Sequence, residues 1–280
     1  MIATTFSREA LLHVVKTLPA APQILAQLGQ LLIDINSDLG EITALLKRDA
    51  ALTARIIRIS NSAIYNTGQP FASLEEALAR VGFTEVYRLT GFAAASQLSD
   101  QKLVCYGITG AQLRENALLT ALVMEALATL TDIDTRLAYT AGLLRSTGKI
   151  AIDRLAKGGV SVPGFEAEKH EGLAAWETAS VGITNVEVCA TVLGEWRFPD
   201  DTIVAARDHY LTVASKCPLS NLLNLAAGAA ERSCFALPGE TRYWDVTPEK
   251  LACAGVQQEQ LDEAVARALG NFRGLRAAIG

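Results

Sequence analysis

Aromatic residues and proline are scarce in this 280-residue sequence. Phenylalanine, tyrosine and tryptophan together make up 6% of it, and proline occurs eight times. Alanine and leucine dominate instead, and this composition favours closely packed helices over β-sheet. Strand-like alternation, low-complexity segments and strict repeats are also missing. Because half of the residues are hydrophobic, enough for a substantial core, we predict an all-α globular protein.

The cysteines follow a pattern that excludes two common uses. Their number is odd, and even the two nearest, Cys217 and Cys234, are far apart in the sequence. Such spacing suits neither a disulfide framework nor a CxxC metal site. Free cysteine is usually buried, so we expect reduced core thiols at all five positions: Cys105, Cys189, Cys217, Cys234 and Cys253.

An excess of positive charge is lacking as well. Lysine and arginine number 25 against 30 acidic residues, which gives a net charge of -5. This balance argues against electrostatic binding to nucleic acid or to anionic lipid. Arg55 and Arg58 could belong to a DNA-recognition helix, but a solvated helix face is the preferred interpretation. Asn61, just beyond them, is expected to bond backbone groups where that helix ends.

Long apolar runs are absent too. The N-terminal segment carries Arg8 and Glu9 before an amphipathic pattern, unlike a secretory signal peptide. No stretch approaches the roughly 18 apolar residues that a membrane span requires. We therefore predict a cytoplasmic protein that does not associate with membranes.

Clear helix-start signals are present. Asp38 with Glu41, and Ser73 with Glu76, have the spacing of capping boxes, and the pair 247–248 is a cap followed by proline. A polar, glycine-containing segment at 99–110 separates two helical series. We expect an N-terminal helical part at 1–105 and a second helical part at 106–280. In the latter, helices are predicted at 112–130, 135–146, 149–156, 168–180, 185–195, 200–212, 218–236 and 257–269.

The segment AGLLRSTGKIAI, residues 141–152, places Arg145 and Ser146 where the apolar pattern would hide side chains from water. Its Gly-Lys pair could be mistaken for a phosphate-binding loop. However, five residues rather than four separate the glycines, and Ile150 stands where such a loop has serine or threonine. We therefore do not assign a phosphate-binding loop here.

This segment instead resembles the GLLHDIGK motif of the HD metal-dependent phosphohydrolase superfamily. Three further segments, LPAAPQIL, DAALTARIIRISNSA and FASLEEALARVGFTEVYRL, resemble in order the motifs of the HDOD domain, an HD-related module of bacterial signalling proteins. The resemblance covers roughly 18–230. It implies an all-helical HDOD fold in which an N-terminal helical subdomain packs on an HD-like bundle.

The resemblance also indicates which residues stand at the metal-binding positions of the HD superfamily. The set that it implies is Glu115, Arg145, Ser146, Asn185, His209 and Gly228. A divalent metal needs several imidazoles and carboxylates that converge on one point, and this set offers one histidine and one glutamate. We therefore predict a degenerate pocket that binds no metal and no other cofactor.

Two interpretations of Arg145 remain open. It could extend to solvent from a helix end, where a cation suits the helix dipole. Alternatively, its guanidinium could occupy the vacated cation position and pair with Glu115.

Several functions are compatible with this pattern. The preferred one is a non-enzymatic regulatory protein of bacterial signal transduction that binds protein partners. A metal-dependent phosphohydrolase or cyclic-nucleotide phosphodiesterase would need a centre rebuilt around Glu115, Asn185 and His209. A nucleotide could also bind without being cleaved, with phosphate contacts from Arg145 and Lys149. Direct DNA regulation is the least favoured.

Overall fold

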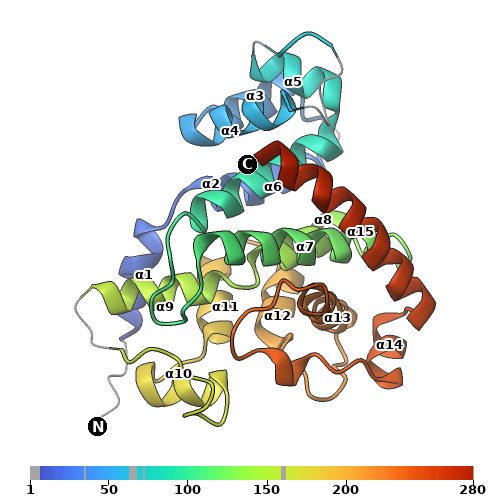
Figure 1. The fold of residues 1–280 in the computed structure, drawn as a ribbon. Coiled ribbons are helices and arrows are strands. Elements are labelled where there is room, and N and C mark those ends of the chain that lie inside the picture. Colours follow the sequence, from blue (N-terminus) through green and yellow to red (C-terminus); the bar gives the residue numbers. More distant parts are fainter. Residues whose placement is uncertain (1–6, 35, 63–67, 72, 159–161, 280) are drawn as a thin grey trace. The chain divides into compact units, whose positions relative to one another are not determined.

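The computed structural model describes residues 7–34, 36–62, 68–71, 73–158 and 162–279 (Figure 1). Regular structure within these ranges is helical, and the β-type pairing is an isolated bridge between Leu103 and Ile108. The predicted all-α class is confirmed. Ala63 and Ala72, which belong to two of the motifs, lie outside the described residues.

The chain forms two compact units. The large unit comprises 1–18 and 98–268, and the small unit comprises 19–97 and 269–280. The expected parts were 1–105 and 106–280. In the structure the N-terminal segment 1–18 belongs to the large unit, and the C-terminal segment 269–280 belongs to the small unit. The small unit contains α2 (Ala21–Leu31), α3 (Leu39–Leu46), α4 (Ala50–Ser60), α5 (Leu74–Val81) and nearly all of α6 (Phe83–Leu98).

The large unit contains the remaining helices. It begins with α1 (Arg8–Thr17) and resumes with α7 (Gly110–Ala128). The helices that follow are α8 (Thr135–Leu144), α9 (Thr147–Lys157), α10 (Leu173–Val181), α11 (Asn185–Glu195), α12 (Asp200–Asp208), α13 (Pro218–Arg232), the 3-10 turn η1 (Thr241–Tyr243) and α14 (Pro248–Ala254). The last helix, α15 (Gln258–Ile279), continues ten residues beyond its predicted end at 269. The buried Phe272 and Leu275 extend its apolar pattern into the small unit.

The helix starts follow the local signals. Asp38 and Glu41 form the capping box that the sequence predicted at the start of α3. Ser73 caps α5 by accepting a hydrogen bond from the Glu76 amide. Side-chain oxygens at these positions satisfy amides that have no partner inside the helix.

Asn61 connects two segments of the small unit. Its amide group donates to the Phe71 carbonyl at 3.0 Å and accepts from the Phe71 N–H at 2.6 Å. The side chain thus replaces a backbone partner just after α4 ends, as the sequence predicted.

Helix α7 forms the centre of the large unit. It is buried along most of its length and packs against α8 and α13 (Figure 1). Two glycines of the AGLLRSTGKIAI segment permit close approaches of helix backbones, Gly142 to α7 and Gly148 to the start of α11. A Cβ atom on Gly142 would lie 2.7 Å from the Cα of Ala121, and one on Gly148 would lie 1.8 Å from the carbonyl oxygen of Asn185. These glycines therefore serve helix packing.

The prediction for the cysteines is wrong in part. Cys105 and Cys189 are buried and Cys217 is half-buried, but Cys234 and Cys253 are exposed. Whether a thiol is buried depends on whether its face of the helix packs against another element. Isolated cysteines form no periodic pattern, so the sequence does not predict which of them are buried. Among the described residues, no helix is both long and apolar enough to cross a bilayer.

Candidate functional site

The α8–α9 junction carries the side chains around which the candidate site is built. Arg145 ends α8, Ser146 precedes α9, and Lys149 lies in the first turn of α9. All three are buried, with Arg145 at 1% exposure and Lys149 fully enclosed. Burying two cations is costly unless each finds a charged partner and enough acceptors.

Glu240 is the charged partner of Arg145. Arg145 Nη2 lies 2.9 Å from Glu240 Oε2, and Nη1 lies 3.2 Å from Oε1, so that the pair is bidentate. Nη2 also donates to Asn116 Oδ1 at 2.7 Å. The first interpretation of Arg145 is wrong, because its guanidinium is buried. The second interpretation expected a carboxylate partner, and the carboxylate that pairs with Arg145 is Glu240 and not the predicted Glu115. The carboxylate comes from a different part of the chain.

Lys149 binds the same carboxylate from another direction. Its ammonium group donates to Glu240 Oε1 and to the Tyr210 hydroxyl, 2.7 Å away. Tyr210 in turn donates to Glu240 Oε1 at 2.7 Å. Burial alone would raise the pKa of Glu240, but Arg145 and Lys149 hold it well below its usual value. The pKa of Lys149 is lowered, chiefly by burial. We call Arg145, Lys149, Tyr210 and Glu240 the ion cluster.

His209 lies at the edge of the ion cluster in its neutral form. Its Nδ1 lies 2.8 Å from the Ala206 carbonyl oxygen, and its Nε2 lies 3.3 Å from Arg145 Nη1. A guanidinium can only donate, so Nε2 is the acceptor and the proton resides on Nδ1. Burial, assisted by Arg145, lowers the pKa of His209 to about 3.

A second buried carboxylate, Glu177, lies next to the ion cluster and is held by neutral donors. Tyr106 donates its hydroxyl to Glu177 Oε1 at 2.7 Å, and Asn185 donates its backbone and side-chain N–H groups to Oε2 at 2.8 and 3.1 Å. Asn185 also reaches the Tyr210 hydroxyl at 3.4 Å, which joins the two groups. Burial raises the pKa of Glu177.

The residues implied by the HD resemblance are therefore only partly brought together. Arg145, Asn185 and His209 belong to the network, whereas Glu115 is half-buried and its neighbour Asn116 bonds Arg145. Successive side chains on a helix point about 100° apart, so Asn116 can face Arg145 while Glu115 points in a different direction.

The other two predicted positions contribute little polar chemistry. Ser146 is buried, but its hydroxyl has no hydrogen-bond partner within the described ranges. At Gly228 a Cβ would lie 2.9 Å from the Trp244 Cβ, so this glycine permits the close approach of Trp244 to α13. Asn224, one turn earlier on α13, donates to the carbonyls of His209 and Tyr243.

Glu240, Glu177 and Tyr210 were not predicted from the sequence. Glu240 stands in an irregular Pro-Gly-Glu segment, where an isolated acidic residue normally faces solvent. Glu177 lies on α10 without a charged neighbour in sequence. Tyr210 directly follows His209, and this adjacency was the one signal that could have identified it.

The predicted phosphate contacts are not open to solvent. Arg145 and Lys149 are both buried, and both bind Glu240. A phosphate could reach them only by displacing that carboxylate.

A divalent metal is the group implied by the HD resemblance, and the ion cluster does not fit it. Within the described part of the chain, no three histidine, cysteine, aspartate or glutamate side chains are grouped so that they could hold a metal ion. The guanidinium and ammonium groups lie at the centre of the network, where they would repel a divalent cation.

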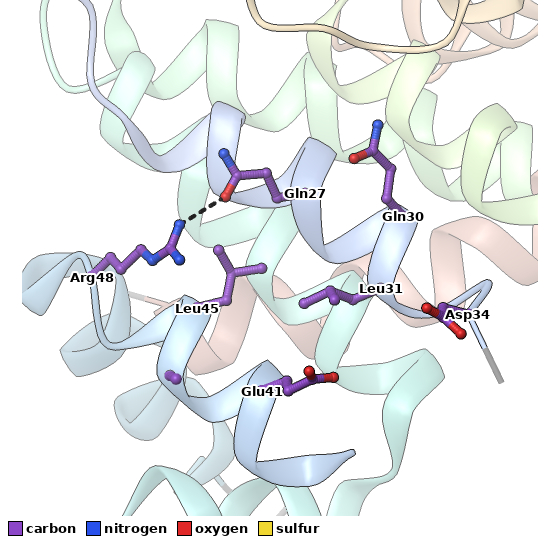
Figure 2. A pocket seen from close by; sticks show the side chains of 8 residues that line it. Gln27, Gln30, Leu31, Asp34, Glu41, Leu45 and Arg48 are labelled. Carbon is purple, nitrogen blue, oxygen red and sulfur yellow. Dashed lines mark hydrogen bonds between the residues drawn. The ribbon is translucent and has the colours of Figure 1, made fainter. Parts of the chain in front are cut away.

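The small unit has a polar pocket of about 530 Å³ between α2 and α3. Figure 2 shows Arg48 bonded to Gln27 at one end and Asp34 at the other, with Leu31 and Leu45 between them. Gln30, Glu41 and Ala44 complete its lining. This pocket was not predicted from the sequence. It contains both signs of charge on exposed side chains.

An all-helical bundle whose α8–α9 junction carries buried polar residues is the architecture expected of an HD-related helical domain. The family model described as the HDOD domain matches residues 18–212. The chain belongs to the HDOD domain family, as the motif resemblance predicted.

Solved structures agree with this fold. An HDOD domain protein of unknown function from Geobacter sulfurreducens has a TM-score of 0.69 at 19% identity, with 98% of each chain covered. A protein from Marinobacter aquaeolei VT8 assigned to signal transduction has a TM-score of 0.73 at 20% identity, covering 98% of this chain and 65% of its own.

A curated relative, an uncharacterized protein of Treponema pallidum (strain Nichols), is 23% identical over 258 residues. The match covers 90% of this chain and spans 49% of that relative's length.

Proposed function

We propose that this protein is a non-enzymatic regulator in bacterial signal transduction that acts by binding other proteins. The observation that carries the proposal is the ion cluster at the α8–α9 junction, where the HD resemblance implies a metal. Glu240 neutralises buried cations there. A site of this composition provides structure and has no evident means of activating water.

The competing hydrolase hypothesis needs a metal to activate water and to neutralise phosphate charge. A centre rebuilt around Glu115, Asn185 and His209 would have to gather these three side chains. Asn185 is committed to Glu177, and both ring nitrogens of His209 are already hydrogen-bonded. Both facts favour the regulatory role.

The HDOD family and the Marinobacter protein assigned to signal transduction support a signalling role. Direct DNA binding remains the weaker alternative, because the basic helix face is small. Arg58 is exposed, but Arg55 on the same helix is half-buried. A regulator of this kind would influence gene expression through a protein partner.

Metal analysis combined with turnover assays tests the proposal. We expect protein purified without chelator to contain no stoichiometric metal and to release no product from phosphomonoesters, phosphodiesters or cyclic dinucleotides. His209→Gln is the control for trace activity, because a centre that uses His209 would lose turnover in this variant while a contaminant would not. Stoichiometric metal together with His209-dependent turnover would overturn the proposal.

Capture of partners from the native host tests the positive half of the proposal. We expect one protein to be enriched reproducibly by the folded chain and to bind it again after both are purified. If no purified protein binds again, partner binding as the mode of action must be abandoned.

A further inference from the structure

Glu240 is held as a bound anion would be held. Four hydrogen bonds from three side chains converge on its carboxylate: two from Arg145, one from Lys149 and one from Tyr210. The carboxylate is 1% exposed. Two of the three donors are cations, and charge-assisted bonds of this kind are the strongest that a carboxylate makes in proteins.

The donors and the acceptor come from different kinds of structure. Arg145 and Lys149 are fixed at the α8–α9 junction, and Tyr210 follows the end of α12. Glu240 instead belongs to the connection between α13 and α14, next to Gly239, which has a φ of 82°. A Cβ atom on Gly239 would lie 2.7 Å from the Phe165 ring, so a glycine is needed to bring this connection into place. The connection thus provides the carboxylate, whereas the helices position the side chains that bind it.

We propose that Arg145, Lys149 and Tyr210 form an oxyanion-binding site in the large unit, which Glu240 occupies as a tethered ligand. Free carboxylates, and oxyanions of similar charge such as inorganic phosphate, are the ligands that this site selects. The site has the opposite charge preference to the metal site implied by the HD resemblance.

Glu177 provides an internal comparison. It is buried as completely as Glu240, at 0% against 1% exposure. Its hydrogen-bond donors are the neutral Tyr106 and Asn185. Removing Glu177 leaves neutral donors, whereas removing Glu240 leaves two buried cations that lack their carboxylate. Only the removal of Glu240 leaves an uncompensated buried charge that a free anion would neutralise.

Chemical rescue of Glu240→Ala tests the site. The substitution removes a carboxylate of about the size of acetate. Thermal unfolding of the full chain is measured in acetate, in inorganic phosphate and in chloride at matched ionic strength. We expect acetate at about ten times its Kd to raise the folded-to-unfolded ratio of Glu240→Ala about elevenfold over chloride. Phosphate should also raise this ratio over chloride.

Two further variants separate this effect from general stabilisation by salts. Glu177→Ala is the matched control and should gain no more from acetate than the wild-type protein gains. Adding Lys149→Met to Glu240→Ala should weaken or abolish the response, because one of the two cations is then gone. An equal response of Glu240→Ala and Glu177→Ala to acetate would overturn the proposal.

If Glu240→Ala does not fold in chloride, the same comparison is made on refolding from urea and followed by the helical circular dichroism signal. Recovery in acetate or phosphate but not in chloride supports the site. Failure to recover in any oxyanion, under conditions in which the wild type refolds, counts against it. The site is independent of the proposed function, because these experiments measure folding and anion affinity and neither turnover nor partner binding.

Discussion

At the scale of single residues, the ion cluster explains why polar groups can occupy the interior of the large unit. Each cation has a carboxylate within hydrogen-bonding distance, and that carboxylate has donors on several sides. His209 takes part as a neutral ring between Arg145 and the Ala206 carbonyl. Its buried position makes folding depend on pH.

Stability should fall as the pH drops below about 6.5, the ordinary pKa of histidine, in part because of His209. Its pKa in the folded state is about 3, so between these values the unfolded chain binds a proton that the native protein does not. Unfolding therefore takes up protons, and the free energy of unfolding decreases by up to about 1.4 kcal/mol per pH unit.

Urea unfolding between pH 6 and pH 4.5 measures this contribution. The free energy of unfolding of His209→Gln should decrease less steeply with falling pH than that of the wild type. The difference in slope corresponds to at most one proton taken up on unfolding, because the variant lacks this imidazole. An unchanged slope in His209→Gln would contradict the prediction.

At the scale of helices, close approach decides which residues the α8–α9 segment can contain. Gly142 lies against α7 and Gly148 lies against the start of α11, in both cases with backbone as the neighbour. Backbone of a packed helix cannot move aside as the end of a long side chain can. The glycines of AGLLRSTGKIAI are thus required by the packing that places Arg145 and Lys149.

Gly148→Ala should destabilise the protein by about 1–3 kcal/mol or more, because its Cβ would lie 1.8 Å from the Asn185 carbonyl oxygen. Gly194→Ala on α11 is the matched control. Its Cβ would meet only the Ile203 side chain, at 4.0 Å, and alanine favours helix, so stability should be unchanged or slightly higher. Chemical denaturation of both variants measures the difference, and similar effects would show that close packing does not explain Gly148.

At the scale of the whole molecule, the two compact units contain different sets of reporter residues. All five cysteines lie within the large unit, and two of them are exposed. Helices are present in both units. Thiol reactivity therefore reports on the large unit alone, whereas circular dichroism reports on both.

Thiol labelling of the native protein should modify Cys234 and Cys253 quickly and Cys217 more slowly. Cys105 and Cys189 should be protected until the large unit unfolds, because each is buried and burial raises the pKa of each thiol to about 11. Mass spectrometry after timed labelling distinguishes the sites. Rapid modification of Cys189 in native buffer would mean that the packing around α11 opens easily.

The sequence alone determined the helical class, the family and most helix starts of this protein. These features depend on local patterns, such as the capping box at Asp38 and Glu41, or on motifs that lie within continuous segments. It also marked Arg145 and Ser146 as unusual residues in an apolar stretch.

Only the tertiary structure decided which carboxylate pairs with Arg145. Glu115 was the partner in one of the two interpretations that the sequence left open, but Glu240 is the actual one and is 95 positions away in sequence. No periodic pattern connects residues so distant, because their contact depends on how α7, α12 and the connection after α13 converge on the α8–α9 junction. The assembled site is therefore a product of packing, while the helices that build it follow from the sequence.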